Sequence, residues 1–265
     1  MQPKKTNGRR ERHAASQGPA RATDRRQAHP GPQTPRRHCP VQFLYEDIDV
    51  IVADKPAGLP VIAPEGSRTK TLYDIVTAHM QKTSPRGRAA VVHRLDRDTS
   101  GVMLFAKNAR AKKALMDNWN KLVHKRGYVA LIEGTMPAEC GTLDSWLIEN
   151  RAGQVYETKP GTRGALRAIT HWKTIATAEG APHSLVELEL ETGRKHQIRA
   201  QLAAIGHPVA GDTRYGARTD PASRLCLHAH LLEFEHPFTH KVLVFESPVP
   251  KVFYQSGSEQ LQSDR

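Results

Sequence analysis

The densest run of charged and polar residues in the sequence is His93–Gly101, which reads HRLDRDTSG and is flanked by apolar stretches. We expect a polar loop held between two buried elements. Its two carboxylates, Asp96 and Asp98, stand among two arginines, and a nearby guanidinium favours the ionised form of a carboxyl group. An ionised aspartate can act as a nucleophile, a general base or a metal ligand. A purely structural alternative is a salt-bridged turn in which Asp98 or Thr99 caps a helix.

A second polar cluster, Glu191–Gln201, collects four residues at the start of an expected helix: Arg194, Lys195, His196 and Arg199. Such a group suits the binding of phosphates or of a partner carboxylate. The apolar residues Ile198, Leu202 and Ile205 are expected to hold this helix to the core, which would leave its polar side as the wall of a cleft. A solvated helix end would give the same pattern.

Neither of two possible metal chemistries fits the sequence well. The D-x-D spacing of Asp96 and Asp98 occurs in phosphatases with an aspartate nucleophile, but Arg97 between the carboxylates opposes a divalent cation. Cys226, His228 and His230 alternate along an expected strand without an evident fourth ligand, so that a zinc site is not favoured. We therefore expect no bound metal.

Strands and amphipathic helices surround both clusters in the sequence. Alternating or continuous apolar runs predict strands over 41–45, 50–54, 102–106, 128–133, 166–174, 184–190, 224–235 and 242–246. Apolar residues at helical spacing predict helices over 71–82, with a capping box at Thr71 and Asp74, from Asn108 to about Val123, and over 196–205. Strands outnumber helices and many are joined as hairpins, which indicates a mixed, largely antiparallel sheet.

The net charge of +12 is concentrated at the N-terminus, where residues 1–38 alone contribute +8. Those residues contain no Val, Ile, Leu, Phe, Trp or Tyr, so we expect a disordered basic arm that suits phosphate backbones, although a tail that only increases solubility would look similar. The sequence contains no apolar run of membrane-spanning length and no secretory signal. The three cysteines lie far apart and indicate a reducing compartment.

Several sequence blocks follow one another along the chain: Val52–Leu59, His93–Gly101, Arg126–Tyr128, Glu191–Gln201, Gly206–Gly216 and Arg224–Ala229. In this order they resemble the RluA-type family of RNA pseudouridine synthases, whose H-R-L-D-x-x-T-S-G signature is present here. The resemblance covers about residues 41–254. It implies an α/β (α+β) fold of the pseudouridine synthase kind, with a catalytic domain over 39–254. The basic arm over 1–38 lies outside the resemblance, and we expect a flexible tail over 255–265.

The resemblance also implies roles for individual residues. Asp96 matches the essential catalytic aspartate, Arg199 the arginine that pairs with it, and Tyr128 the aromatic residue that stacks on the uracil and takes the C5 proton. Arg94 matches the residue that fills the space left by a flipped nucleotide, and Lys55 falls in a block that lines the pocket floor. Arg194 and His196 complete the expected RNA-binding set, without a separate catalytic role.

The implied reaction is the isomerisation of uridine to pseudouridine within ribosomal or transfer RNA. It is redox-neutral, so that no cofactor, metal or nucleotide is expected. We further expect a cytoplasmic monomer that binds RNA and no membrane. The alternative is a catalytically silent RNA-binding or ribosome-assembly factor on the same fold.

Overall fold

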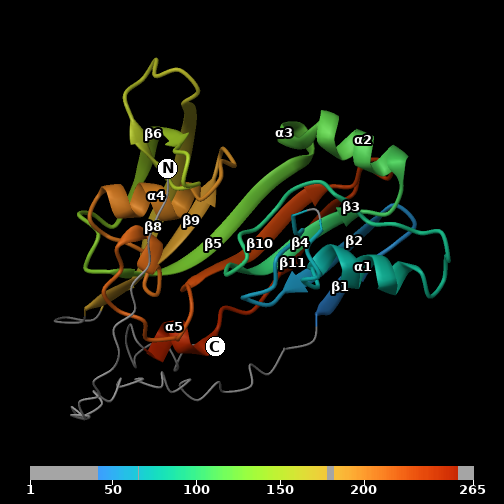
Figure 1. Cartoon of the computed structure of the whole chain (residues 1–265), viewed down its shortest axis with the longest axis horizontal. Helices are drawn as coiled ribbons and strands as arrows, with labels where there is room; N and C mark the ends of the chain where they lie inside the picture. The colour runs from blue at the N-terminus through green and yellow to red at the C-terminus, as the bar shows by residue number, and fades with distance from the viewer. Residues whose placement is uncertain (1–40, 65, 178–181, 256–265) are drawn as a thin grey trace, which may run out of the picture. The chain divides into compact units, whose positions relative to one another are not determined.

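The structure, a computed structural model, describes residues 41–64, 66–177 and 182–255, and one sheet of eleven strands connects them. The expected arm over 1–38 lies outside the described residues, as does the expected tail except for Gln255. Along the sheet the strands follow the order β1-β2-β4-β10-β5-β9-β8-β6-β7, with β3 paired to β4 and β11 to β10 (Figure 1).

The strands and helices have the following bounds. The strands are β1 (Gln42–Glu46), β2 (Val50–Lys55), β3 (Ala90–Val91), β4 (Ser100–Ala106), β5 (Val123–Glu133), β6 (Cys140–Glu149), β7 (Val155–Thr158), β8 (Leu166–Thr177), β9 (His183–Leu190), β10 (Leu227–Glu235) and β11 (Val242–Glu246). The helices are α1 (Leu72–Met80), α2 (Ala109–Asp117), α3 (Trp119–Leu122), α4 (Gln197–Ala204), the 3-10 turn η1 (Thr213–Tyr215) and α5 (Lys251–Gln255).

The expected mixed, largely antiparallel sheet is confirmed. Among the described strands only β4 and β10 pair in parallel, through His228 with Ser100 and Ala229 with Gly101. All seven residues of β4 are buried, as befits a strand near the centre of the sheet with apolar residues on both faces. Helix α1 begins as predicted, because the Thr71 side chain accepts the N–H of Asp74 while Asp74 accepts the N–H of Thr71.

The predicted continuous helix from Asn108 to Val123 is wrong. Asn108 caps α2 as expected, but the helix ends at Asn118, whose side-chain amide donates to the carbonyl of Ala114 and whose φ is −121°. A short helix α3 follows, and the chain is already a strand at Val123, five residues before the predicted start. An asparagine side chain that competes for backbone hydrogen bonds is a usual reason for such a break.

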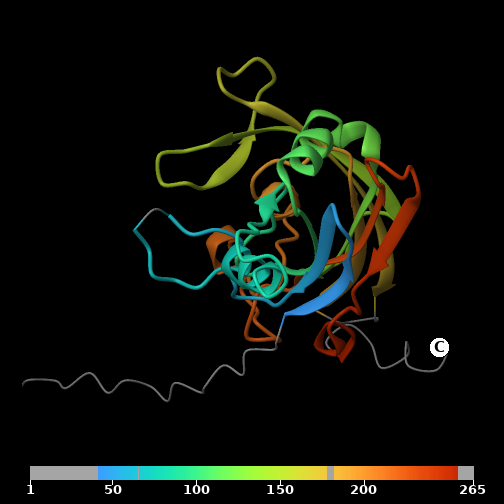
Figure 2. The same cartoon turned by 90° about the vertical axis from the view of Figure 1, so that its right-hand side faces the viewer.

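The sequence pattern did not predict β6 and β7. Half of the residues of β6 are polar or small, and all of its residues but Leu147 are half-buried or exposed, so that the apolar alternation is weak. These two strands lie at the end of the sheet, where β7 pairs only with β6. In Figure 2 the segment that contains them projects away from the rest of the sheet.

The parallel pairing of β4 with β10 fixes the C-terminal end of the His93–Gly101 loop. Gly101 has φ of 116°, and a Cβ placed there would lie 2.1 Å from the carbonyl oxygen of Ala229. Beside it Ser100 accepts a hydrogen bond from Arg224 at 2.8 Å and contacts Nδ1 of the buried His228 at 2.8 Å. The last residues of the HRLDRDTSG loop are thus fixed to β10 by backbone approach and by hydrogen bonds.

We predict that Gly101→Ala lowers the free energy of unfolding by more than about 3 kcal/mol, because the methyl group meets β10 and the backbone is strained as well. Gly161→Ala is the matched control, since Gly161 also has positive φ but has no atom within 4 Å of the added Cβ. Backbone strain alone should cost about 1 kcal/mol there. Urea unfolding measures both, and equal losses would contradict the close approach.

Candidate active site

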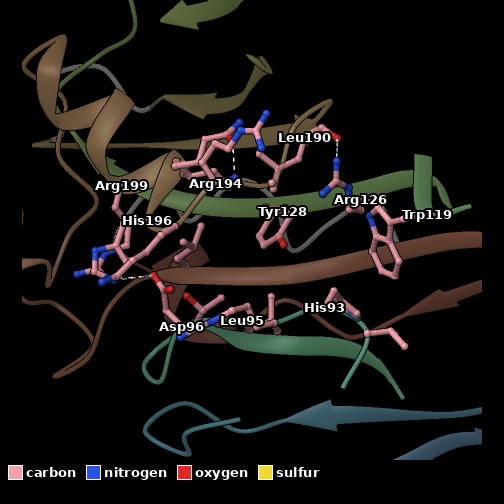
Figure 3. Close-up of a pocket in the computed structure, with 18 of the residues that line it drawn as sticks. His93, Leu95, Asp96, Trp119, Arg126, Tyr128, Leu190, Arg194, His196 and Arg199 are labelled. Carbon is pink, nitrogen blue, oxygen red and sulfur yellow. Dashed lines mark hydrogen bonds and ion pairs between the residues drawn. The ribbon is translucent and has the colours of Figure 1, made fainter. Parts of the chain in front are cut away.

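A cavity of about 380 Å³ opens between the His93–Gly101 loop, the start of β5 and the N-terminal end of α4 (Figure 3). Its volume falls in the range usual for sites that take small ligands. The residues that line it come from three segments of the chain: 92–96 with Thr99, 119–128, and 190–199, with Leu227 from β10.

The Asp96 carboxylate lies at one end of this cavity and is bound by Arg199. Nη1 of Arg199 donates to Oδ2 of Asp96 at 2.9 Å. The other side of the same guanidinium donates twice to Asp212, from Nε at 2.6 Å and from Nη2 at 2.9 Å. Burial acts to lower the pKa of Arg199, but the hydrogen bonds and charges of Asp212 and Asp96 outweigh it and raise that pKa above its usual value. Arg199 is therefore a permanent cation beside Asp96.

His196 is the second group beside the Asp96 carboxylate. Its Nε2 lies 3.8 Å from Oδ2 of Asp96, and its Nδ1 lies 2.9 Å from the Tyr215 hydroxyl. The Tyr215 oxygen already accepts the N–H of Val155, so that its own proton is free to go to Nδ1. Burial lowers the pKa of His196 although the charge of Asp96 acts to raise it, and this favours the neutral imidazole. Its φ of 50° is unusual for a residue other than glycine and turns the chain into α4.

Two buried glutamines fix α4 to the sheet and so set the direction of Arg199. Gln197 donates to the carbonyl of Ile169 at 3.0 Å, and Gln201 donates to the carbonyl of Ala168 at 2.9 Å, both on β8. Ile198 and Leu202 are buried as predicted, whereas Ile205 is 39% exposed and does not hold the helix to the core. The hydrogen bonds of Gln197 and Gln201 to β8 therefore supply part of the attachment of α4 to the core, which the sequence pattern had assigned to Ile205.

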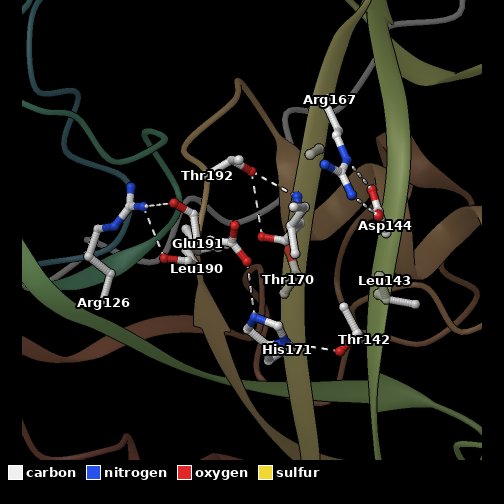
Figure 4. A network of polar contacts seen from close by, with 12 residues as sticks. Arg126, Thr142, Leu143, Asp144, Arg167, Thr170, His171, Leu190, Glu191 and Thr192 are labelled. Atoms are coloured by element: carbon white, nitrogen blue, oxygen red, sulfur yellow. Dashed lines mark hydrogen bonds and ion pairs between the residues drawn. The ribbon is translucent and has the colours of Figure 1, made fainter. Parts of the chain in front are cut away.

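Tyr128 lies in the middle of the cavity, on β5 (Figure 3). It is buried, and among the described residues its hydroxyl has no hydrogen-bond partner. Burial raises the pKa of Tyr128 to about 12, so the group is a neutral phenol at pH 7. Two residues earlier Arg126 donates through Nη2 to the carbonyls of Leu190 at 2.9 Å and Glu191 at 2.8 Å (Figure 4).

The structure brings six of the seven sequence-predicted site residues to this cavity. Arg94 and Arg194 are exposed at its rim, where Arg194 donates through Nε to the carbonyl of Arg167 at 3.0 Å. Among the described residues none pairs with the Arg94 guanidinium.

Lys55 is the exception, because it does not form the floor of this cavity as expected, and its contact with RNA stays a prediction. Its side chain is fully buried, does not line the cavity, and donates to the carbonyls of Leu59 and Arg97 at 2.8 Å and of Pro56 at 3.1 Å. Burial lowers its pKa to about 7. Lys55 therefore links the end of β2 to the His93–Gly101 loop through the carbonyl of Arg97, and its side chain does not face the solvent.

Asp212 and Tyr215 were given no role from the sequence, although both belong to the Gly206–Gly216 block that carried the resemblance.

In the part of the chain that the structure describes, no three His, Cys, Asp or Glu side chains form a group suited to a metal ion. Both ring nitrogens of His228 are already engaged, with Ser100 and with the carbonyl of Ser247. No described helix combines the length and apolar character needed to cross a membrane.

Residues 49–204 match the sequence family described as RNA pseudouridylate synthase. The chain belongs to this family. It is 38% identical over 210 residues to the uncharacterized RNA pseudouridine synthase YhcT of Bacillus subtilis, in a match that covers 79% of this chain and 69% of that protein. It is 36% identical over 225 residues to ribosomal large subunit pseudouridine synthase D of Nitrosomonas europaea, covering 80% and 62% of the two chains.

Solved structures agree with the pseudouridine synthase fold. Human RNA pseudouridylate synthase domain containing 1 superposes with a TM-score of 0.62 at 26% identity, over 79% of this chain and 83% of that one. Human RNA pseudouridylate synthase domain containing 4 gives a TM-score of 0.65 at 22% identity, over 80% and 89%. The expectation of this family and fold from the sequence blocks is confirmed.

We predict that Asp212→Asn lowers the free energy of unfolding by about 3 kcal/mol, since it removes the charge of a carboxylate that is 2% exposed in its ion pair with Arg199. The matched control is Asp144→Asn, which breaks an equally bidentate pair with Arg167 on the surface. Exposed pairs contribute little to stability, so this control should lose much less than Asp212→Asn. Urea unfolding compares them, and equal losses would mean that the Asp212 pair does not hold the site together.

Proposed function

We propose that this chain isomerises uridine to pseudouridine within a structured RNA and that Asp96 is its catalytic residue. The observation that carries the proposal is the Asp96 carboxylate, held by the Arg199 guanidinium at 2.9 Å at the end of a cavity that also contains Tyr128. Family membership supplies the reaction: the bond from N1 of uracil to C1′ of the ribose breaks, and a bond from C5 to C1′ forms. C5 loses a proton and N1 gains one, so the reaction balances without a cofactor.

Asp96 supplies negative charge where the reaction needs it. Positive character develops at C1′ as the glycosidic bond breaks, and an ionised carboxylate beside it stabilises that charge. Arg199 keeps the carboxylate ionised and in a fixed direction, because Asp212 holds the guanidinium from the other side. In this proposal Arg199 and Asp212 are positioning residues, while Asp96 touches the reacting atoms.

Tyr128 completes the uracil site in the same proposal. Its ring forms a wall on which uracil stacks, and its unpaired hydroxyl faces the place from which the C5 proton leaves. With its pKa raised to about 12 by burial, the phenol is neutral at rest, so that it takes the C5 proton only as its own proton passes to solvent, from which N1 of the base is protonated. Arg94, exposed at the rim, occupies the space that the flipped uridine leaves in the RNA.

We infer a ribosomal RNA substrate in preference to transfer RNA, since relatives such as the Nitrosomonas europaea protein are named for the ribosomal large subunit. Action on such RNA implies a cytoplasmic protein, and we propose that it works as a monomer because one chain supplies the whole constellation. A silent assembly factor is the second candidate. The complete set of Asp96, Arg199 and Tyr128 disfavours it, because a protein without chemistry has no need of them.

We predict that Asp96→Asn lowers pseudouridine formation at least about a thousandfold and leaves RNA affinity nearly unchanged, because the variant loses only the negative charge of the carboxylate beside C1′. Cellular RNA from strains with and without the protein, mapped with carbodiimide, identifies the uridines and measures turnover. Asp98→Asn is the matched control: the same loop carries it, but its carboxylate pairs with the exposed Arg97. Full turnover by the Asp96 variant would reject the role of this residue, and an unchanged map with RNA binding retained would favour the silent factor.

We also propose that residues 1–38 hold the RNA backbone through their net charge of +8. Removal of this segment should flatten the dependence of the logarithm of RNA affinity on the logarithm of salt concentration, by about 0.7 for each phosphate that the segment neutralises. Turnover on saturating RNA should persist, because the cavity lies wholly within the remaining chain. Filter binding over a salt range of roughly 50 to 300 mM measures the slope, and an unchanged slope would mean that the segment does not touch RNA.

A further inference from the structure

The cavity has a second end, opposite Asp96, that the proposed chemistry does not use. Figure 3 shows Asp96, Arg199 and His196 on one side, Tyr128 in the middle, and Trp119, His93 and Arg126 on the other side. Asn120 lines the cavity next to Trp119. This end therefore offers a large aromatic ring with polar side chains around it.

Trp119 presents an indole ring whose position is fixed. It packs against the apolar cluster formed by β2, β4 and α2, and its ring centroid lies 5.0 Å from that of His93 with 35° between the planes. The rest of the half-buried ring faces the cavity, and among the described residues its N–H has no partner. A rigid, partly open indole beside polar groups is well suited to stacking against a nucleobase.

His93 is a fixed neutral donor beside this ring. Its Nε2 accepts the backbone N–H of Leu104 at 2.9 Å, so the proton of the neutral imidazole is on Nδ1. Burial lowers the pKa of His93 to about 3, and the neutral form therefore prevails at all physiological pH values.

Arg126 and Asn120 add hydrogen-bond donors with no partner among the described residues. Arg126 is tethered through Nη2 alone, which leaves the donors on Nε and Nη1 for a ligand. Gly193 keeps the space beside Nη1 open, because a Cβ there would lie 2.7 Å from that nitrogen. The exposed amide of Asn120 carries both donor and acceptor atoms for the edge of a base.

We propose that this end of the cavity binds a second nucleobase of the RNA, a neighbour of the target uridine, stacked on Trp119 with its polar edge toward Arg126 and Asn120. The proposal rests on the proposed function, since it places the target uracil on Tyr128. Arg126 lies two residues from Tyr128 on β5, about 7 Å along the strand. Neighbouring bases of a stacked strand are only about 3.4 Å apart. The second base is therefore no longer stacked on the target uracil and stacks on the indole ring of Trp119 instead.

Binding of short RNA tests the subsite without any need for turnover. The probes are a heptamer of uridylate and a heptamer with the same sugar–phosphate backbone but no bases, each carrying a dye for anisotropy. Stacking on indole quenches its fluorescence, so the base-containing heptamer should quench the tryptophan emission of the unaltered protein. The Trp119→Phe variant should lack this part of the quenching, and the backbone alone should produce none.

Affinities give the second readout. Trp119→Ala should weaken binding of the uridylate heptamer about tenfold, Trp119→Phe should restore most of it, and binding of the heptamer without bases should be equal in all variants. Tyr156→Ala is the matched control, because Tyr156 is an aromatic residue 48% exposed on β7 and does not line the cavity. It should bind like the unaltered protein.

Several results would overturn the proposal: quenching that persists in Trp119→Phe, equal affinities of Trp119→Ala and the unaltered protein, an equal loss for the heptamer without bases, or no binding of uridylate at all. Thermal unfolding of each variant shows whether a loss reflects the fold, and Trp119→Phe keeps the core packed. Pseudouridine formation without quenching would reject only this subsite. Quenching without pseudouridine formation in any RNA would reject the proposed function and keep a base-binding pocket.

Discussion

The arrangement of the site depends on one guanidinium that binds two carboxylates. Arg199 holds Asp212 with two donors and Asp96 with a third, so that it joins the loop before β4 to the segment after α4. A lone buried carboxylate or a lone buried arginine would be costly, whereas the three charges together satisfy one another. The pairing with Asp212 also fixes the orientation of the Arg199 guanidinium. Because this group is planar and Asp212 binds one of its edges, only the remaining edge can donate to Asp96. The sheet, the glutamines of α4 and the His196 turn all serve to keep this edge in place.

Much of the site was predictable because its residues stand in compact blocks. The HRLDRDTSG loop and the Glu191–Gln201 cluster each concentrate charges within about ten residues, between apolar runs that had to be buried. The contact of Arg199 with Asp96 followed from the family resemblance, and the geometry agrees with it. Asp212 belongs to the Gly206–Gly216 block, but its neighbours in the sequence do not distinguish an aspartate that pairs with an arginine from one that begins a turn. Such a partner becomes visible only when the chain is folded.

The errors have physical reasons that differ from element to element. Lys55 was expected on the pocket floor because it falls in the Val52–Leu59 block of the resemblance, yet three carbonyls replace its water and make full burial possible. The helix after Asn108 was predicted too long because apolar spacing continues through Trp119 and Leu122, although the Asn118 amide ends it. Strand β6 was not predicted because it lies next to the edge strand β7, where a strand that is only partly buried needs few apolar residues. Periodicity detects burial, and these features depend on hydrogen bonds or on partial exposure.

The contact between Asp96 and Arg199 spans 103 positions of the chain. Closing a loop of that length costs about 4 kcal/mol of chain entropy before any contact offsets it. The intervening residues include β5, β6, β8 and β9, which are neighbours in the sheet, and α4 is fixed to β8. During synthesis, therefore, a growing chain contains the aspartate long before it contains the arginine and Asp212. A truncated product that ends before α4 therefore contains the aspartate without the arginine that orients it.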